Sequence, residues 1–349
     1  MGRGRREGLR SAGSFVKAVV YERYGPPSVL RVSAVPSPSV DADDEVLIRV
    51  QATSINKGDL HLMHGSPLLV RPMAGGFLKP SLRVLGSDVA GIVEGVGRAV
   101  TRFRIGDEVF GDLSESGFGG FAEYVTAKEA HLAIKPAGVD WSTAGAVPSA
   151  GLTALQALRV GGAAPAPEAY DPAGGTRVAV NGASGGVGTF AVQLAKHFGA
   201  HVTGVCSTRN VEMVRGLGAD RVVDYTQDDF TTEDDARYDL ILDAAAYRAA
   251  REHRRGLGPT GVYVLVGGGF RRTIEVMLLG SILSENGGRT VRFMGIKQPD
   301  SEDLALLGQL LESGTLAPAI HRTVSLDEVP TAMDELEKHH ASGKVVVIP

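Results

Sequence analysis

A short run of small residues in this sequence could bind a phosphate group. Ala183, Gly185 and Gly188 form a G-x-G-x-x-G pattern with alanine in the first place, directly after the apolar, β-branched residues 178–180. Apolar residues then recur at helical spacing over 190–198, and a second apolar stretch follows. Strand, glycine turn, helix and strand within about 30 residues predict a dinucleotide site. The residues expected to contact it are Ala183, Ser184, Gly185, Gly186, Val187 and Gly188.

The physical reason is access to the backbone. Small side chains let a pyrophosphate approach main-chain N–H groups, and the N-terminus of a helix favours its negative charge. The alternative is that the glycines serve only the tight packing of a helix on a strand.

The end of the second strand bears on which dinucleotide binds. An NAD site usually has an acidic residue about 20 residues past the glycines, bonded to the ribose 2′-hydroxyl. Here the strand ends in Cys206, Ser207, Thr208 and Arg209, with no acid. Arg209 could hold a 2′-phosphate, with Ser207 and Thr208 donating to it, or it could be a solvated arginine on a loop. We expect NADPH.

Composition limits the remaining classes. The chain has 349 residues, 43% of them hydrophobic, which favours more than one globular domain. The net charge of −4 gives no electrostatic footprint for nucleic acid. The single cysteine, Cys206, excludes an intramolecular disulfide and a four-cysteine zinc site. This use of cysteine fits a reducing cytosol, so we expect a cytoplasmic location. No apolar run reaches membrane-spanning length, so we expect no membrane segment.

The elements that must position the glycine turn fall into two patterns. Residues 15–150 contain short apolar runs separated by turn residues, including 100–109 and 118–125, which predict a β-barrel-like domain; 141–158 has helical spacing. Residues 151–298 alternate strands and helices, which predicts a doubly wound parallel sheet. The basic residues 1–14 are expected to be a disordered tail, and 299–349 to return to the first domain through a strand at 344–348.

Several motifs together resemble one family. They are K-A-V-V-Y-E-R-Y-G at Lys17, L-G-S-D-V-A-G at Leu85, G-D-E-V-F-G at Gly106, N-G-A-S-G-G-V-G at Asn181 and S-G-K-V-V-V at Ser342. The chain resembles the medium-chain dehydrogenase/reductase superfamily, in its zinc-independent quinone oxidoreductase and enone reductase branch. The resemblance implies an α/β fold, with a GroES-like β-barrel catalytic domain and a Rossmann domain. It also implies a small apolar quinone or carbonyl substrate and a homodimer.

Zinc-dependent relatives have a cysteine in the segment that matches 54–59. They have Gly-His-Glu where this chain has Gly86, Ser87 and Asp88. A catalytic zinc normally needs three protein ligands, and both positions have lost their ligand type. His61 and His64 are expected to be loop or surface residues, because no third ligand follows at a recognisable spacing. We expect no metal.

Without a metal, the protein must orient a conjugated acceptor and offer it hydrogen bonds. Asn56 is the candidate by resemblance, because an asparagine there faces the nicotinamide and the substrate in relatives. Asp59 could move a proton or only cap the next helix. Both are catalytic candidates, and Asn56 is also a cofactor candidate.

Further cofactor contacts follow from the resemblance and from the ends of strands, where ligands bind in open α/β sheets. Ala244 replaces part of an Asp-x-Val-Gly pattern common in relatives, which weakens its assignment, and Lys344 could equally be a surface lysine. The segment 65–79 either borders the substrate or is a packed loop. The cofactor candidates of this group are Thr153, Tyr225, Ala244, Gly267, Gly268, Gly269, Phe270 and Lys344.

Three functions remain open from the sequence. The first is an NADPH-dependent reductase of quinones or α,β-unsaturated carbonyls. The second is a metal-free alcohol dehydrogenase or a biosynthetic enoyl-thioester reductase. The third is a nucleotide-binding regulatory protein without catalytic activity.

Overall fold

The computed structural model describes residues 14–164, 175–232, 237–267, 270–284, 288–295, 299–338 and 342–349. The expected tail at 1–14 lies outside these residues, apart from Ser14. The chain divides into two compact units. Unit 1 comprises residues 1–149, 298–312 and 320–349, and unit 2 comprises 150–297 and 313–319. Residues 313–319 therefore belong to unit 2, whereas the sequence pattern assigns all of 299–349 to the first domain.

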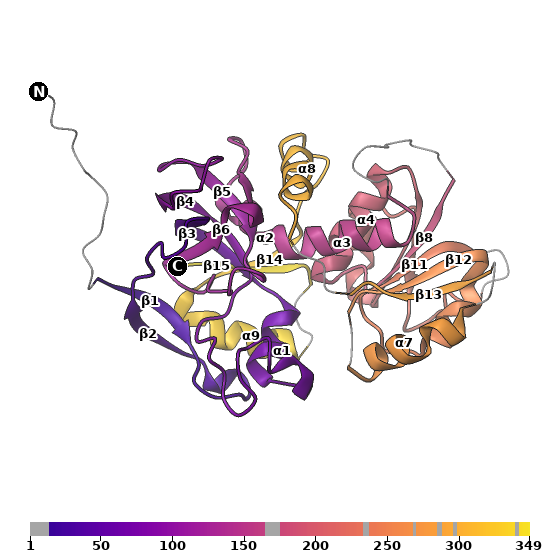
Figure 1. Ribbon diagram of the computed structural model, residues 1–349. Coiled ribbons are helices and arrows are strands. Elements are labelled where there is room, and N and C mark those ends of the chain that lie inside the picture. The colour runs from indigo at the N-terminus through magenta and orange to yellow at the C-terminus, as the bar shows by residue number, and fades with distance from the viewer. Residues whose placement is uncertain are drawn as a thin grey trace, which may run out of the picture. The chain divides into compact units, whose positions relative to one another are not determined.

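Unit 1 is built on a mainly antiparallel sheet (Figure 1). Among the described residues the strand order is β14-β15-β3-β4-β5-β7, with β6 paired to β3 and a separate pair β1-β2. β15 lies between β14, to which it is parallel, and β3, to which it is antiparallel. The strands are β1 (Phe15–Val20), β2 (Arg31–Pro36), β3 (Glu45–Ile55), β4 (Asp88–Val96), β5 (Glu108–Asp112), β6 (Tyr124–Lys128), β7 (Leu132–Ile134), β14 (Ile320–Ser325) and β15 (Lys344–Ile348).

Burial alternates along β3, as a strand with one face on a core requires. Its inward residues Val46, Ile48 and Val50 pack with residues of β4, β5 and β6. The helices of this unit are α1 (Lys57–His64), α2 (Trp141–Ala146), α8 (Ser301–Glu312) and α9 (Val329–Glu337), with short 3₁₀ turns η1 (Pro27–Val29), η2 (Leu68–Val70), η3 (Glu129–His131) and η6 (Leu326–Glu328).

Three sequence-based expectations for this region are wrong in detail. The helix expected over 141–158 is interrupted, because α3 (Pro148–Val160) starts at a proline that lacks an N–H and restricts Val147 before it. The strand expected at 100–109 starts only at Glu108, after a turn at Gly106 with φ 96°. The strand expected at 118–125 starts at Tyr124, because Phe118 itself has a positive φ of 61°.

Unit 2 is a doubly wound parallel sheet, as the sequence predicts. Its strand order among the described residues is β10-β9-β8-β11-β12-β13, all parallel, which is the Rossmann arrangement. The strands are β8 (Arg177–Asn181), β9 (His201–Cys206), β10 (Arg221–Asp224), β11 (Tyr238–Asp243), β12 (Leu257–Leu265) and β13 (Thr290–Phe293).

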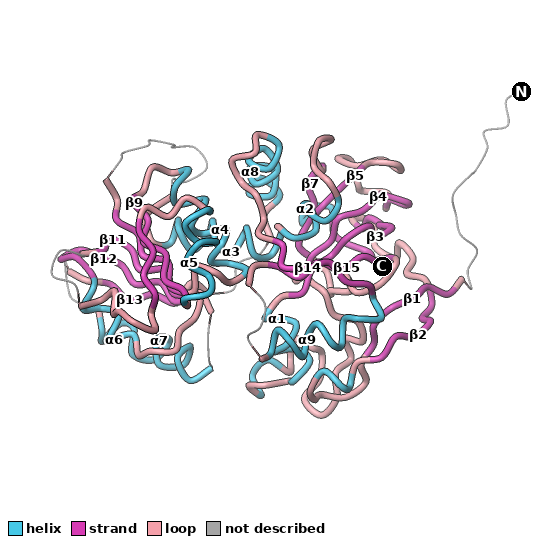
Figure 2. Tube along the Cα trace, turned by 180° about the vertical axis from the view of Figure 1, so that it is seen from behind, coloured by secondary structure: helices cyan, strands magenta, loops and turns pink. Residues whose placement is uncertain are grey.

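Helices cover both faces of this sheet, so its central strands read as continuous apolar runs. α4 and α7 lie on opposite sides of it (Figures 1 and 2). The helical segments are α4 (Gly186–His197), α5 (Val211–Gly216), α6 (Ala250–His253) and α7 (Phe270–Leu283), with 3₁₀ turns η4 (Thr208–Asn210) and η5 (Arg254–Gly256). None of the helices in the described ranges is long and apolar enough to cross a membrane.

Candidate active site

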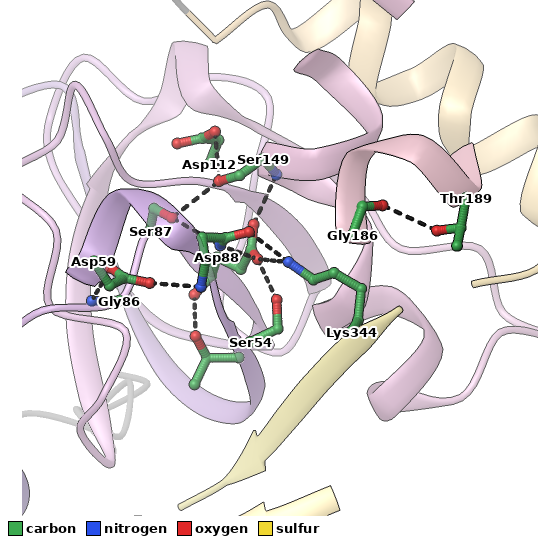
Figure 3. Close-up of polar contacts among 12 residues, drawn as sticks. Ser54, Asp59, Gly86, Ser87, Asp88, Asp112, Ser149, Gly186, Thr189 and Lys344 are labelled. Carbon is green, nitrogen blue, oxygen red and sulfur yellow. Dashed lines mark hydrogen bonds and ion pairs between the residues drawn. The ribbon is translucent and has the colours of Figure 1, made fainter. Parts of the chain in front are cut away.

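Strand register gathers a group of polar side chains at one end of the unit 1 sheet. Val345 pairs with Ile55 across β15 and β3, so Lys344 at the start of β15 meets Asn56 just past the end of β3. Ala52 pairs with Ala90 across β3 and β4, which brings Ser54 opposite Asp88. We call Ser54, Asn56, Ser87, Asp88 and Lys344 the Asn56 cluster. Figure 3 labels four of its members, Ser54, Ser87, Asp88 and Lys344. Lys344 is 2% exposed, so the alternative that it is a surface lysine is wrong.

Asp88 is the centre of this cluster and is completely buried. Its Oδ2 accepts hydrogen bonds from the Ser54 hydroxyl, from Asn56 Nδ2 at 2.7 Å and from Lys344 Nζ at 3.3 Å. Its Oδ1 accepts the backbone N–H of Ser149 at 2.7 Å. Both oxygens of the buried carboxylate are therefore hydrogen-bonded, which offsets the cost of removing the charge from water.

A second buried carboxyl lies beside the first. Asp112 pairs with Asp88 across β4 and β5, and the Ser149 hydroxyl lies 2.8 Å from Asp112 Oδ2 and 3.0 Å from Ser87 Oγ. Burial, followed by the charge of Asp88, raises the pKa of Asp112 to about 6. Sequence reasoning did not single out Asp112 or Ser149, since nothing local shows that β5 and the start of α3 reach this point.

Asp59 lies next to the cluster and caps α1. One carboxylate oxygen accepts the backbone N–H of Asn56 at 2.8 Å, and the other accepts that of Gly86 at 3.1 Å. Burial raises the pKa of Asp59 to about 7, against the lowering effect of these two bonds. The capping interpretation of Asp59 is confirmed. A catalytic role for it stays a prediction.

The donor set of the cluster does not fit zinc. Ser54 and Asn56 are hydrogen-bonded to Asp88, and the Lys344 ammonium already supplies a positive charge beside that carboxylate. Across the described ranges, no group of three or more His, Cys, Asp or Glu side chains could hold a metal ion. His61 and His64 lie on α1 rather than on a loop, and His64 Nε2 is 3.1 Å from Glu337 Oε1.

In unit 2 the glycine turn combines close packing with open space at the start of α4. Gly182, with φ 82°, turns the chain after β8, and α4 begins at Gly186 with Gly185 as its N-cap. A Cβ on Gly188 would lie 2.1 Å from the Gly182 carbonyl oxygen, so this glycine lets helix and strand pack. A Cβ on Gly185 would meet only that oxygen, at 3.4 Å, so the space beside Gly185 is open to a ligand.

The side chains expected near a 2′-phosphate lie past the end of β9. Ser207 is half-buried, and Thr208 and Arg209 are exposed in η4. The Thr208 hydroxyl donates to Asp224 Oδ2 at 2.6 Å.

Two neighbours of these side chains were missed by sequence reasoning. Asn210, 8% exposed, donates through Nδ2 to Ser184 Oγ at 3.0 Å and to Ser207 Oγ at 3.2 Å, and so joins the glycine turn to the second strand. Asp224, the last residue of β10, places an acid beside Thr208. The only signal for either is its position next to a strand end.

Three of the remaining cofactor candidates lie just past the carboxyl ends of strands in this sheet. Tyr225 follows β10 and is 55% exposed, Ala244 follows β11, and Gly267 lies just past β12. Thr153 lies instead on α3 and is half-buried. Gly268 and Gly269 fall outside the described residues, and of Phe270 only its place at the start of α7 is described.

A buried group at the end of β11 was also missed. Asp243 pairs with Asn181 across β11 and β8 and accepts from its Nδ2 at 2.8 Å and from the Tyr263 hydroxyl at 2.7 Å. It also accepts the backbone N–H groups of residues 245 and 246. Asp243 therefore holds the turn after β11 against the strand that leads into the glycine turn.

The segment 65–79 is held at both ends by one arginine. Arg71 donates to the carbonyl oxygens of Gly65 at 3.0 Å and Phe77 at 2.7 Å, and it lies over the ring of Tyr24. Large apolar side chains remain exposed on it, namely Leu68, Met73, Phe77 and Leu78. It is a braced loop with an apolar surface.

Comparison with known proteins agrees with both units. Residues 42–137 match the alcohol dehydrogenase GroES-like domain, and residues 217–347 match the family model described as zinc-binding dehydrogenase. The chain is 33% identical to quinone-oxidoreductase QR1 of Triphysaria versicolor, over 97% of this chain and 100% of that protein. It is also 33% identical to the NADPH-dependent alkenal/one oxidoreductase of Arabidopsis thaliana, over 96% of this chain and 80% of that protein.

A solved structure, the quinone oxidoreductase from Coxiella burnetii, superposes with a TM-score of 0.83 at 29% identity, covering 96% of this chain and all of that one. The chain belongs to the quinone oxidoreductase branch of the medium-chain dehydrogenase/reductase superfamily. It is thus an oxidoreductase of a family that depends on pyridine nucleotides. The resemblance predicted from sequence motifs is confirmed.

Proposed function

We propose that this protein transfers a hydride from NADPH to a quinone or an α,β-unsaturated carbonyl without a metal ion. The observation that carries the proposal is the Asn56 cluster, in which the half-buried Asn56 side chain is hydrogen-bonded to a buried carboxylate and a buried ammonium. The relatives named quinone oxidoreductase and alkenal/one oxidoreductase support the acceptor class. They do not favour an alcohol dehydrogenase or an inactive regulator.

The residues of unit 2 fit a dinucleotide. The open space beside Gly185 and the N-terminus of α4 suit a pyrophosphate. Ser207, Thr208 and Arg209 would hold a 2′-phosphate, and the absence of an acid at the end of β9 favours NADPH over NADH.

When bound, the reduced nicotinamide supplies the hydride. A conjugated acceptor disperses the resulting negative charge over its own oxygen, so the protein needs to orient it rather than to activate it with a metal. The hydrogen bonds of Asn56 are preorganised by its neighbours before any ligand arrives. The proton that completes the reduction then comes from water.

The deciding experiment is a steady-state assay of NADPH oxidation with quinones, enones, enoyl thioesters and aldehydes. We expect turnover with quinones or enones and little with aldehydes. Turnover restricted to enoyl thioesters or aldehydes would assign the second function, and no turnover despite NADPH binding would assign the third. Elemental analysis should find well under one zinc per chain, and a chelator should leave activity unchanged. Stoichiometric zinc whose removal abolishes turnover would refute a metal-free reaction.

We also propose a homodimer formed through unit 2. Met277, Leu278 and Ile282 are apolar and exposed on α7, which packs on β13 at one edge of the sheet. Leu278→Glu should shift the mass measured by sedimentation from dimer toward monomer, while an unchanged mass would place the contact elsewhere.

The cellular compartment stays a prediction, because composition favours the cytoplasm whereas the plant relative QR1 is named as chloroplastic.

A further inference from the structure

One residue in the turn after β11 has a backbone conformation that is unusual for its type. Ala246 has a φ of 46°, in the left-handed region, and among the described residues Phe118 is the only other non-glycine residue with a positive φ. This conformation is unfavourable for alanine, because its Cβ comes too close to the following carbonyl oxygen. Such strain persists only where the surrounding structure holds the backbone, and it is concentrated where chains contact ligands.

The Asp243 carboxylate holds this backbone in place. Its Oδ1 accepts the backbone N–H groups of Ala246 at 2.7 Å and of Ala245 at 3.1 Å. Its Oδ2 accepts the Tyr263 hydroxyl of β12 at 2.7 Å and lies 3.3 Å from His253 Nε2 of α6. Asp243 is completely buried, so it cannot exchange these partners for water. The carboxylate therefore fixes the turn at 244–246 against the layer beneath β11.

Asp243 also joins this turn to the neighbouring strand β8. Its Oδ1 accepts Asn181 Nδ2 at 2.8 Å, and the backbone N–H of Ala244 donates to the Asn181 carbonyl oxygen at 3.0 Å. Asn181 and Asp243 are the last residues of β8 and β11 and pair in register. The chain runs from β8 outward to β10 and then returns to β11, so the strand order reverses between β8 and β11. Ligands of open α/β sheets bind outside the carboxyl ends of the strands at this reversal.

The glycine turn, on the other side of the reversal, is held by different bonds. The backbone N–H groups of Gly182 and Ala183 donate to the Val205 carbonyl oxygen of β9, at 3.1 and 3.0 Å. The backbone N–H of Gly185 donates to the Gly182 carbonyl oxygen at 3.0 Å. None of these three bonds involves Asp243. The glycine turn is thus fixed by β9 and by its own backbone, whereas the turn at 244–246 depends on Asp243.

A dinucleotide at this edge of unit 2 extends over both turns. Its pyrophosphate is expected at the glycine turn and its 2′-phosphate at residues 207–209 past β9, so the remaining half extends toward β11. We propose that Asp243 is a positioning residue that shapes the turn at 244–246 for the nicotinamide half of the coenzyme and leaves the adenosine half unaffected. This inference rests on the coenzyme of the proposed function and does not depend on the acceptor.

The test compares two ligands by calorimetric titration of the full chain. NADPH carries both halves, whereas adenosine 2′,5′-bisphosphate lacks the nicotinamide riboside. Asp243→Ala removes the acceptor of the two backbone N–H groups and should raise the Kd for NADPH roughly ten- to a hundredfold. The Kd for the bisphosphate should change by less than about twofold, because β9 still holds the glycine turn. Asp243→Asn, which keeps an acceptor oxygen, should recover most of the NADPH affinity.

Asn181→Ala keeps the test decisive if Asp243→Ala folds poorly. It removes only the bond from β8 and leaves the carboxylate its other partners, so the Kd for NADPH should rise roughly three- to tenfold, as for one hydrogen bond. The Kd for the bisphosphate should again stay within about twofold. Asp239→Ala is the matched control, because Asp239 accepts the backbone N–H of Arg177 at 2.8 Å and so joins the same two strands near their amino ends. It should leave both Kd values unchanged.

The outcomes separate this inference from the proposed function. Equal losses for the two ligands in the folded variants, or wild-type affinity for NADPH in them, would overturn the positioning role. NADPH binding without turnover of any acceptor would overturn the reductase function alone. A wild-type chain that binds neither ligand would overturn both.

Discussion

Two residues of opposite charge lie near the ends of adjacent strands: Arg209 follows β9, and Asp224 is the last residue of β10. The side chains of Thr208, Thr226 and Gln227 donate to the Asp224 carboxylate, and the Thr208 bond is the largest cause that holds its pKa below the ordinary value. These bonds fix the Thr208 side chain, but they also place the negative charge of Asp224 near the expected 2′-phosphate, which it would repel. Coenzyme preference at this point therefore depends on a basic side chain that outweighs Asp224.

We predict that Arg209→Ala raises the KM for NADPH and leaves that for NADH nearly unchanged. Loss of a charge-assisted contact is worth about 1.5–3 kcal/mol, or roughly ten- to a hundredfold. Arg215→Ala, which removes an exposed arginine paired with Glu212 on α5, is the control. Equal affinity of the wild type for the two coenzymes would show that no 2′-phosphate is recognised here.

A second prediction at this scale concerns pH. The pKa of Asp59 is raised to about 7 in the folded chain from an ordinary value of 3.8, chiefly by burial. Folding therefore favours the protonated acid, so its contribution is complete below pH 3.8 and is lost as pH rises through about 7. We expect the free energy of unfolding to fall by a few kcal/mol between about pH 4 and 7, at roughly 1.4 kcal/mol per pH unit within this window.

Denaturant titrations of wild type and Asp59→Asn across that range check this expectation. The free energy of unfolding of Asp59→Asn should depend less steeply on pH than that of wild type. Some dependence should remain in the variant, because the pKa of Asp112 is also raised, to about 6. Asp327→Asn removes an exposed carboxylate of the same unit and should keep the wild-type slope. Parallel curves for Asp59→Asn and wild type would mean that Asp59 titrates normally.

At the scale of elements, two glycines of the glycine turn have different roles: Gly188 lets the helix pack on the strand, and Gly185 leaves space for a ligand. Gly188→Ala places a Cβ against the Gly182 carbonyl oxygen and should destabilise the chain by about 1–3 kcal/mol. Gly185→Ala meets no such obstacle but fills the space expected for the pyrophosphate. Gly185→Ala should leave the melting temperature unchanged. It should raise the coenzyme Kd by roughly tenfold or more, which corresponds to a loss of about 1.4 kcal/mol or more in binding free energy. Unchanged affinity in Gly185→Ala would favour the pure packing explanation.

The layer beneath β11 contains a buried histidine. His253 is 1% exposed, stacks between Phe230 and Tyr263, and lies 3.3 Å from Asp243 Oδ2. Burial lowers its pKa, against the opposing effect of Asp243. The neutral ring is thus favoured by folding, and this contribution is present above the ordinary pKa and is lost as pH falls.

We predict that wild type loses stability on the acid side of pH 6.5 and that His253→Phe loses less, measured by chemical unfolding at several pH values. His201→Phe, at an exposed position at the start of β9, is the control. Equal acid sensitivity of His253→Phe and wild type would assign the loss to other groups.

Elements with a local sequence signal could be predicted, whereas contacts that depend on strand pairing could not. The glycine turn and β15 were predicted because their signals are local: glycine spacing in one, an uninterrupted apolar run in the other. The Asn56 cluster could not be assembled in this way. Lys344 is 288 positions from Asn56, and only the pairing of Val345 with Ile55 brings them together. Asp224 could not be predicted from the usual spacing, because it ends β10, whereas the acid of an NAD site is expected at the end of the second strand, here β9.

At the scale of the whole molecule, each unit has its own core. Val346 is completely buried in β15 and packs with Ala52 and Ala146 of unit 1. Val346→Asp would place an unpaired charge there, at a cost of several kcal/mol. Hydrogen exchange should then show lost protection in β3 and β15 with β8, β9 and β11 still protected. Equal loss in both sheets would show that the units unfold together.

The place of β15 has a consequence for the order in which the chain is made. Most residues of unit 2 leave the ribosome in one continuous stretch, 150–297, and can fold as they emerge, since domains generally fold as units during synthesis. The unit 1 sheet begins earlier but waits longer, because the strand between β14 and β3 consists of residues 344–348. Until those residues emerge, one edge of β3 lacks its neighbour and the partner of Asn56 has not yet been translated. A nascent chain should therefore bind coenzyme before it can turn it over.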